Sequence, residues 1–124
     1  MQRLLVVDDE AGVREAMKRY LERRGYAIDC AARAADAKAL LAEVRYDAVI
    51  TDLQLSAGEG AEGFAVVVEA RRLCSGTRII LFTGQASEAV EVAARRLGVD
   101  VLLHKPRPLP EIEGILQGLL RGAA

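Results

Sequence analysis

The sequence VITD at residues 49–52 is an apolar run that ends on a carboxylate. Three further apolar runs end on polar side chains in the same way: LLVV (4–7) before Asp8 and Asp9, IILF (79–82) before Thr83, and VLL (101–103) before His104 and Lys105. Short, continuously apolar runs are typical of central strands in a parallel sheet, which are buried on both faces. Because parallel strands end at one edge of their sheet, we expect these polar residues to meet there.

The segments between these runs carry apolar residues at helical spacing, so strands and helices are predicted to alternate. The predicted strands are residues 3–8, 26–31, 47–52, 78–83 and 99–104, and the predicted helices are residues 11–24, 34–44, 63–73, 87–97 and 110–121. Five such alternations indicate a parallel sheet with helices on both faces. Right-handed crossovers favour the strand order 2-1-3-4-5, so the predicted fold class is α/β, a flavodoxin-like doubly wound five-stranded sheet with five helices.

Several local signals support these boundaries. Gly25 and Gly98 stand where two helices should stop, and Ser87 is placed to cap the start of a third. Residues 26–31 alternate between apolar and polar, which predicts an edge strand with one wet face. The helix at 63–73 carries the apolar residues Phe64, Val67 and Val68, after a loop at 53–62 rich in glycine and small residues.

Length and composition exclude several classes of protein. The chain has 124 residues, which fits a single domain over 1–124, and its formal net charge is −1. No basic stretch stands out, so direct nucleic-acid binding is not expected. No apolar run approaches the ~18 residues of a membrane span. The two cysteines, Cys30 and Cys74, form no framework and are expected to be reduced, which favours a cytoplasmic protein.

The predicted strand order reverses between the first and third strands, and ligands bind at such a reversal. These two strands end on Asp8, Asp9 and Asp52. Three converging carboxylates would repel one another, and a hard dication would relieve that repulsion. An all-oxygen ligand set without histidine or cysteine favours Mg²⁺, or Mn²⁺, over zinc.

Thr83 and Lys105 end the two flanking strands and add a hydroxyl and an ammonium group. Both are suitable donors for a tetrahedral oxyanion. A metal, two donors and a central carboxylate together predict phosphoryl transfer onto Asp52. Catalysis of this kind depends mostly on positioning and on charge neutralisation.

Four motifs give the chain its resemblance to a known family: VVDDE (6–10), DAVITD (47–52), FTG (82–84) and HKP (104–106). Over its whole length the chain resembles the receiver domain of two-component response regulators, and it is similar to the single-domain receivers of chemotaxis. The resemblance implies a signalling domain of a phosphorelay, a phosphoprotein that catalyses only its own phosphorylation and autodephosphorylation.

The resemblance also assigns roles. It implies that Asp52 accepts a phosphoryl group from a histidine kinase or phosphotransfer protein, and that Thr83 and Lys105 contact this group. It implies that Asp8, Asp9 and Asp52 bind Mg²⁺ together with the backbone carbonyl of Gln54. A cis bond between Lys105 and Pro106 is a further expectation. A downstream output protein or domain would dock on helix 87–97, strand 99–104 and helix 110–121, the surface through which a homodimer would also form.

The sequence departs from the family pattern in three places. Leu102 stands where receivers often carry an aromatic switch residue. Switching would then depend on a movement of the Thr83 hydroxyl and on the adjacent Gly84 and Gln85. The run 58–63 makes the loop after Asp52 about three residues longer than usual, and Ser56 replaces a common proline. Gln54 and Gln85 occupy positions that line the path of attacking water in the family. We therefore hypothesise that these two amides set the lifetime of the phosphoryl group.

Three alternatives remain open at this point. An aspartyl-phosphate hydrolase would share Asp52, Thr83 and Lys105, but it usually has a second aspartate where this chain has Gln54. A receiver-fold interaction module would signal without phosphorylation, an option that Leu102 leaves open. A flavin-binding protein of the same topology is less favoured, because the acidic residues after the first strand would repel its phosphate.

Overall fold

The computed structural model describes residues 1–55 and 62–122, and every predicted strand and helix is present within two residues of its expected bounds. The elements are β1 (Arg3–Val7), α1 (Ala11–Arg23), β2 (Ala27–Ala31), α2 (Ala34–Glu43), β3 (Ala48–Thr51), α3 (Glu62–Leu73), β4 (Arg78–Thr83), α4 (Glu88–Arg96), β5 (Val101–His104) and α5 (Leu109–Arg121). Of the predicted loop after β3, residues 56–61 lie outside the described residues, so the expectations placed on Ser56 and on most of 58–63 stay predictions.

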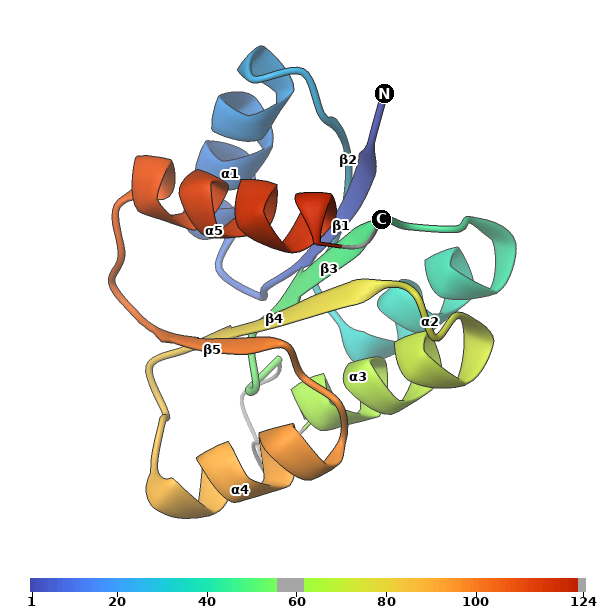
Figure 1. Cartoon of the computed structure of the whole chain (residues 1–124), viewed down its shortest axis with the longest axis vertical. Coiled ribbons are helices and arrows are strands. Elements are labelled where there is room, and N and C mark those ends of the chain that lie inside the picture. Colours follow the sequence, from blue (N-terminus) through green and yellow to red (C-terminus); the bar gives the residue numbers. More distant parts are fainter. Residues whose placement is uncertain (56–61, 123–124) are drawn as a thin grey trace.

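The five strands form one parallel sheet in the order β2-β1-β3-β4-β5, which confirms the predicted topology. Helices α1 and α5 cover one face of the sheet, and α2, α3 and α4 lie on the other (Figure 1). All four residues of β3 are buried, as are the last four of β1. The apolar runs 4–7, 49–51 and 79–82 are therefore strands covered on both faces, whereas the run 101–103 forms the edge strand β5, in which only Leu103 is buried.

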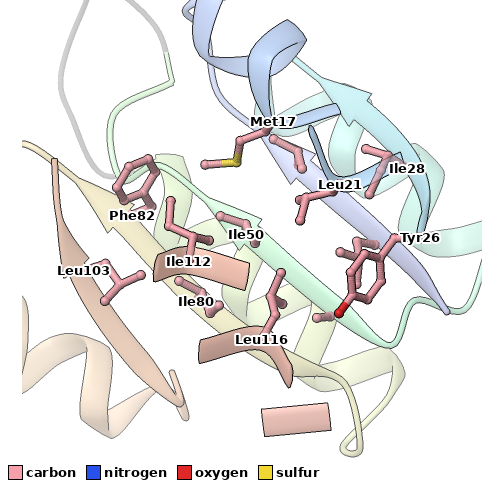
Figure 2. Close-up of a cluster of buried hydrophobic side chains, with 13 residues drawn as sticks. Met17, Leu21, Tyr26, Ile28, Ile50, Ile80, Phe82, Leu103, Ile112 and Leu116 are labelled. Carbon is pink, nitrogen blue, oxygen red and sulfur yellow. The ribbon is translucent and has the colours of Figure 1, made fainter. Parts of the chain in front are cut away.

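The largest core cluster lies between the sheet and the pair α1 and α5 (Figure 2). Met17 and Leu21 from α1 meet Ile112 and Leu116 from α5 over the strand residues, as their helical spacing predicts. A second cluster packs α2 and α3 against the opposite face. A third and smaller cluster contains Leu53, Leu81 and Ala94, with Leu102 packed against it.

The predicted helix ends are also confirmed. Gly25 and Gly98 have φ angles of 98° and 88°, the left-handed region that glycine enters without strain. The Ser87 hydroxyl accepts a hydrogen bond of 3.2 Å from the Val90 amide and so caps α4.

The apolar residues of α3 do not all face the core. Val67 is buried, whereas Val68 is 48% exposed. The buried face instead contains Val66 and Ala70, which the sequence did not single out. None of the helices in the described ranges is both long enough and apolar enough to cross a membrane.

A buried tyrosine braces the sheet at the end where the strands begin. Tyr46 is 2% exposed, and its hydroxyl donates a 2.6 Å hydrogen bond to Asp29 Oδ2 in the edge strand β2. Burial, together with this hydrogen bond, raises the pKa of the Tyr46 hydroxyl above its ordinary value. The hydroxyl therefore remains a donor, and it ties the segment before β3 to β2 across β1.

We predict that Tyr46→Phe lowers the free energy of unfolding by about 1.5 kcal/mol, because it removes a buried hydrogen bond to a carboxylate. Urea unfolding measures the change. The matched control is Tyr20→Phe, since the half-buried Tyr20 hydroxyl makes no hydrogen bond within the part of the chain that the structure describes. Equal effects from the two substitutions would contradict a role for the Tyr46 hydroxyl.

Candidate functional site

Two buried aspartates meet where β1 and β3 end side by side. Val7 pairs with Thr51 in the register of these strands, and the Asp52 amide donates to the Val7 carbonyl at 2.9 Å. On the other side, the Asp8 amide donates to the Ala31 carbonyl of β2 at 3.1 Å. Backbone hydrogen bonds therefore fix both aspartates at the reversal of strand order, where the sequence predicted them.

Lys105 reaches this pair from the end of β5. Its amide donates to the Thr83 carbonyl at 3.0 Å, which holds the ends of β4 and β5 together, and the bond to Pro106 is cis as expected. Its ammonium Nζ lies 2.7 Å from Asp8 Oδ2 and 2.8 Å from Asp52 Oδ2. One ammonium group therefore bridges the two buried carboxylates.

The second oxygen of each carboxylate is held by the backbone. The Glu10 amide donates to Asp8 Oδ1 at 2.9 Å, and the Leu53 amide donates to Asp52 Oδ1 at 2.7 Å. Both amides belong to residues just past the strand ends. The four carboxylate oxygens are thus all hydrogen-bonded, and each carboxylate directs one oxygen to Lys105.

The electrostatics of this pair follow from burial and from the shared ammonium. Burial raises the pKa of Asp8 above its ordinary value, although the hydrogen bonds from Lys105 and from the Glu10 amide act in the opposite direction. Burial alone would lower the pKa of Lys105, but the hydrogen bonds to Asp52 and Asp8 outweigh it and raise this pKa. Lys105 is therefore a charged counterion for the two carboxylates.

Four carboxylates surround the strand ends closely enough to share a cation. Asp8, Asp9, Glu10 and Asp52 each offer one oxygen, and these oxygens lie within 4.8 Å of one another. Asp8 and Asp52 are buried, whereas Asp9 and Glu10 are exposed. Carboxylate oxygens are ligands of hard dications, so this donor set fits Mg²⁺. The sequence identified three of the four residues and missed Glu10.

The remaining predicted residues lie around this cluster. Thr83 is fully buried at the end of β4, and its hydroxyl accepts a 3.0 Å hydrogen bond from the Gln85 amide. Gly84 and Gln85 are exposed, and Gln54 is half-buried two residues after Asp52. The part that the Gln54 carbonyl plays toward a metal stays a prediction.

Leu102 occupies the predicted switch position on β5. It is half-buried, pairs with Leu81 of β4 and packs against the cluster that contains Leu53 and Ala94. Leu53, which follows Asp52, therefore shares one apolar cluster with Ala94 of α4. Whether Leu102 switches stays a prediction.

Two site contacts were not foreseen from the sequence. Arg14 of α1 donates from Nη1 to the Asp8 carbonyl at 2.8 Å, which braces the turn after β1. Gly63 at the start of α3 donates from its amide to the Leu53 carbonyl at 2.7 Å. A Cβ at residue 63 would lie 2.6 Å from Leu53 Cα and would collide with the Asp52 carbonyl. The site therefore requires a residue without a side chain at the start of α3.

Comparison with known proteins places this geometry in a family. Residues 4–117 match the response regulator receiver domain. The transcriptional regulatory protein ResD of Bacillus subtilis (strain 168) is 35% identical over 122 residues, which cover 98% of this chain and 49% of ResD. The chain spans about half the length of the curated relatives it matches.

Solved structures agree. The CheY-like response regulator receiver domain protein from Methanospirillum hungatei JF-1 superposes with a TM-score of 0.93 at 26% identity, covering 99% of this chain and 96% of that one. A response regulator protein from Burkholderia pseudomallei, solved with a phosphorylated aspartic acid, calcium ion and citrate, gives a TM-score of 0.86 at 30% identity, covering 98% and 70%.

Fold, acidic pocket and relatives together define a receiver of the two-component type. The chain belongs to the response regulator receiver domain family.

We predict that Gly63→Ala lowers the free energy of unfolding by about 3 kcal/mol, because the added methyl group meets backbone that cannot move aside. Thermal or urea unfolding measures this loss.

The control is Gly118→Ala in α5, where a Cβ meets nothing within 4 Å. Alanine has the higher helix propensity, so this variant should gain about 0.5–1 kcal/mol. A Gly63→Ala protein as stable as the wild type would show that α3 does not need its close approach to Asp52.

Proposed function

We propose that this domain, over residues 1–124, accepts a phosphoryl group on Asp52 from a phosphohistidine of a histidine kinase or phosphotransfer protein, with Mg²⁺ as cofactor. The observation that carries the proposal is the convergence of Asp52, Asp8 and Lys105 inside a cluster of four carboxylates. A site built only to stabilise the fold would not need the exposed Asp9 beside two buried carboxylates.

The transfer exchanges one bond to phosphorus for another. A carboxylate oxygen of Asp52 attacks the phosphorus, an O–P bond forms, and the N–P bond to the donor imidazole breaks, leaving a histidine that takes up a proton. The Leu53 amide donates to Asp52 Oδ1, and Oδ2 accepts the hydrogen bond from Lys105. Mg²⁺ would be held by Asp8, Asp9, Asp52 and the Gln54 carbonyl, and it would neutralise phosphoryl charge.

Lys105 and Thr83 have complementary roles in this proposal. The Lys105 ammonium, at 2.8 Å from Asp52, is a point charge for a phosphoryl oxygen on that carboxylate. The buried Thr83 hydroxyl, at the end of β4, is the second donor. The domain acts as a signalling component and catalyses only its own phosphorylation and autodephosphorylation.

The neighbouring structure from Burkholderia pseudomallei supports the chemistry, because its name records a phosphorylated aspartic acid and a calcium ion on a related fold. The hydrolase and flavin-binding alternatives have no comparable observation in their favour. The acid/base carboxylate of a hydrolase has no counterpart, since Gln54 stands at its position. A cytoplasmic location is part of the proposal and agrees with the free thiols of Cys30 and Cys74.

For the output we propose the surface of α4, β5 and α5, where a downstream partner or a second receiver would bind. Arg95 and Arg96 are exposed on α4, and the half-buried Leu102 of β5 packs against the cluster that contains Ala94 of α4. Leu53, which follows Asp52, packs in one apolar cluster with Leu81 and Ala94. A structural change at Asp52 would reach α4 and β5 through these contacts.

We predict that incubation with acetyl phosphate and Mg²⁺ adds one phosphoryl group to the wild type, measured by intact mass spectrometry. Asp52→Asn should add none, because an amide oxygen is too weak a nucleophile. Chelation of Mg²⁺ should abolish the adduct as well.

The matched control is Asp47→Asn, at the opposite end of β3, where the carboxylate accepts a hydrogen bond from the Arg3 amide. This variant should be phosphorylated like the wild type. No adduct on the wild type would favour an interaction module, and turnover of many phosphomonoesters would favour a hydrolase.

A further prediction concerns the lifetime of the phosphoryl group. Substitution of Gln54 or Gln85 by alanine should change the dephosphorylation rate several-fold, because these residues stand two positions after Asp52 and Thr83, where side chains line the path of attacking water in the family. Loss of phosphate from the purified phosphoprotein gives the rate. The control is Gln2→Ala, an exposed position before β1. Rates equal to that of the wild type at both sites would refute the hypothesis.

A further inference from the structure

Glu10 occupies the N-cap position of α1, but its side chain does not cap the helix. It precedes α1 in an extended conformation, with φ −85° and ψ 112°, yet its side chain makes no capping hydrogen bond. Its carboxylate instead lies with Oε1 at 3.4 Å from Lys105 Nζ. Glu10 is therefore the third carboxylate in contact with the ammonium that bridges Asp8 and Asp52.

The three carboxylates around Lys105 differ in exposure. The side chains of Asp8 and Asp52 are 2% and 9% exposed, whereas that of Glu10 is 64% exposed. Lys105 itself is only 15% exposed and lies 5.5 Å from the centre of the Phe82 ring. The ammonium group of Lys105 thus contacts two buried carboxylates, those of Asp8 and Asp52, and one solvent-exposed carboxylate, that of Glu10.

A dication bound at this cluster would compete with the Lys105 ammonium for the same two carboxylates. Nζ contacts Asp8 Oδ2 and Asp52 Oδ2, and these two carboxylates belong to the group of four that could share a dication. A dication held by Asp8 and Asp52 would therefore weaken the two short ion pairs of Lys105. A charged lysine in a mostly buried place is stable only if another carboxylate remains within reach.

We infer that Glu10 is a positioning residue for Lys105: it retains the ammonium at the open edge of the site when a cation takes the two buried carboxylates. In this way Glu10 lowers the cost of displacing Lys105 and strengthens cation binding. The inference deepens the proposed function and rests on it only for the identity of the cation, Mg²⁺.

Glu10 also lies close enough to Asp8, Asp9 and Asp52 to attract or ligate the cation directly. The two roles differ in their dependence on Lys105. A direct role would act whether or not the lysine is present, whereas positioning requires it. A double-mutant cycle separates them.

The experiment measures Mg²⁺ affinity by isothermal titration calorimetry for the wild type, Glu10→Gln, Lys105→Gln and the double variant. We expect Glu10→Gln to weaken binding about fivefold beside Lys105, the range of a well-placed surface ion pair. In the Lys105→Gln background the same substitution should weaken binding by about twofold or less. Glu15→Gln, an exposed α1 variant of equal charge change, should leave the affinity of the wild type unaltered.

Equal losses in the two backgrounds, or a larger loss without Lys105, would overturn the inference. Circular dichroism establishes that the variants are folded, so a lost fold is not read as a lost contact. Intact mass after acetyl phosphate treatment separates this test from that of the proposed function. An adduct on Asp52 with equal losses would refute only the role of Glu10, and unequal losses without an adduct would refute only phosphorylation.

Discussion

The site depends on the neutralisation of two buried carboxylates by one ammonium group. Asp8 and Asp52 lie 97 and 53 residues from Lys105 in sequence, so only the folded chain brings the three together. Two buried carboxylates without a counterion would carry a large desolvation penalty. The strand order meets this requirement, since it places β1 beside β3 and lets β5 end across β4 from them. The fold and the chemistry of the site therefore share one electrostatic constraint.

The sequence predicted the sheet, its strand order and the convergence of Asp8, Asp9, Asp52, Thr83 and Lys105. It did so because each of these residues follows an apolar run, and parallel strands leave their ends at one edge. Residues whose role depends on a side-chain direction were missed. The sequence does not reveal that Glu10 turns to Lys105 instead of capping α1, or that Arg14 reaches back to a carbonyl.

Helix α3 shows a second limit of sequence patterns. Apolar residues occupy positions 64 and 66–68, which wrap around the helix and define no single face. The packing of α3 against the sheet and α2 buries Val66 and leaves Val68 exposed. The need for glycine at residue 63 could not be predicted from the sequence either. It arises because the backbone carbonyl of Asp52, eleven positions earlier, leaves no room for a Cβ atom. Contacts between distant segments set these features.

The hydrogen bond between Gly63 and Leu53 joins the two ends of the connection from β3 to α3 at its base. When the ends of a connection are fixed by their own contact, each doubling of its length costs only about 0.6 kcal/mol in closure entropy. Because this contact lies beside Asp52, a change in the length of the connection should leave the position of that carboxylate unaltered.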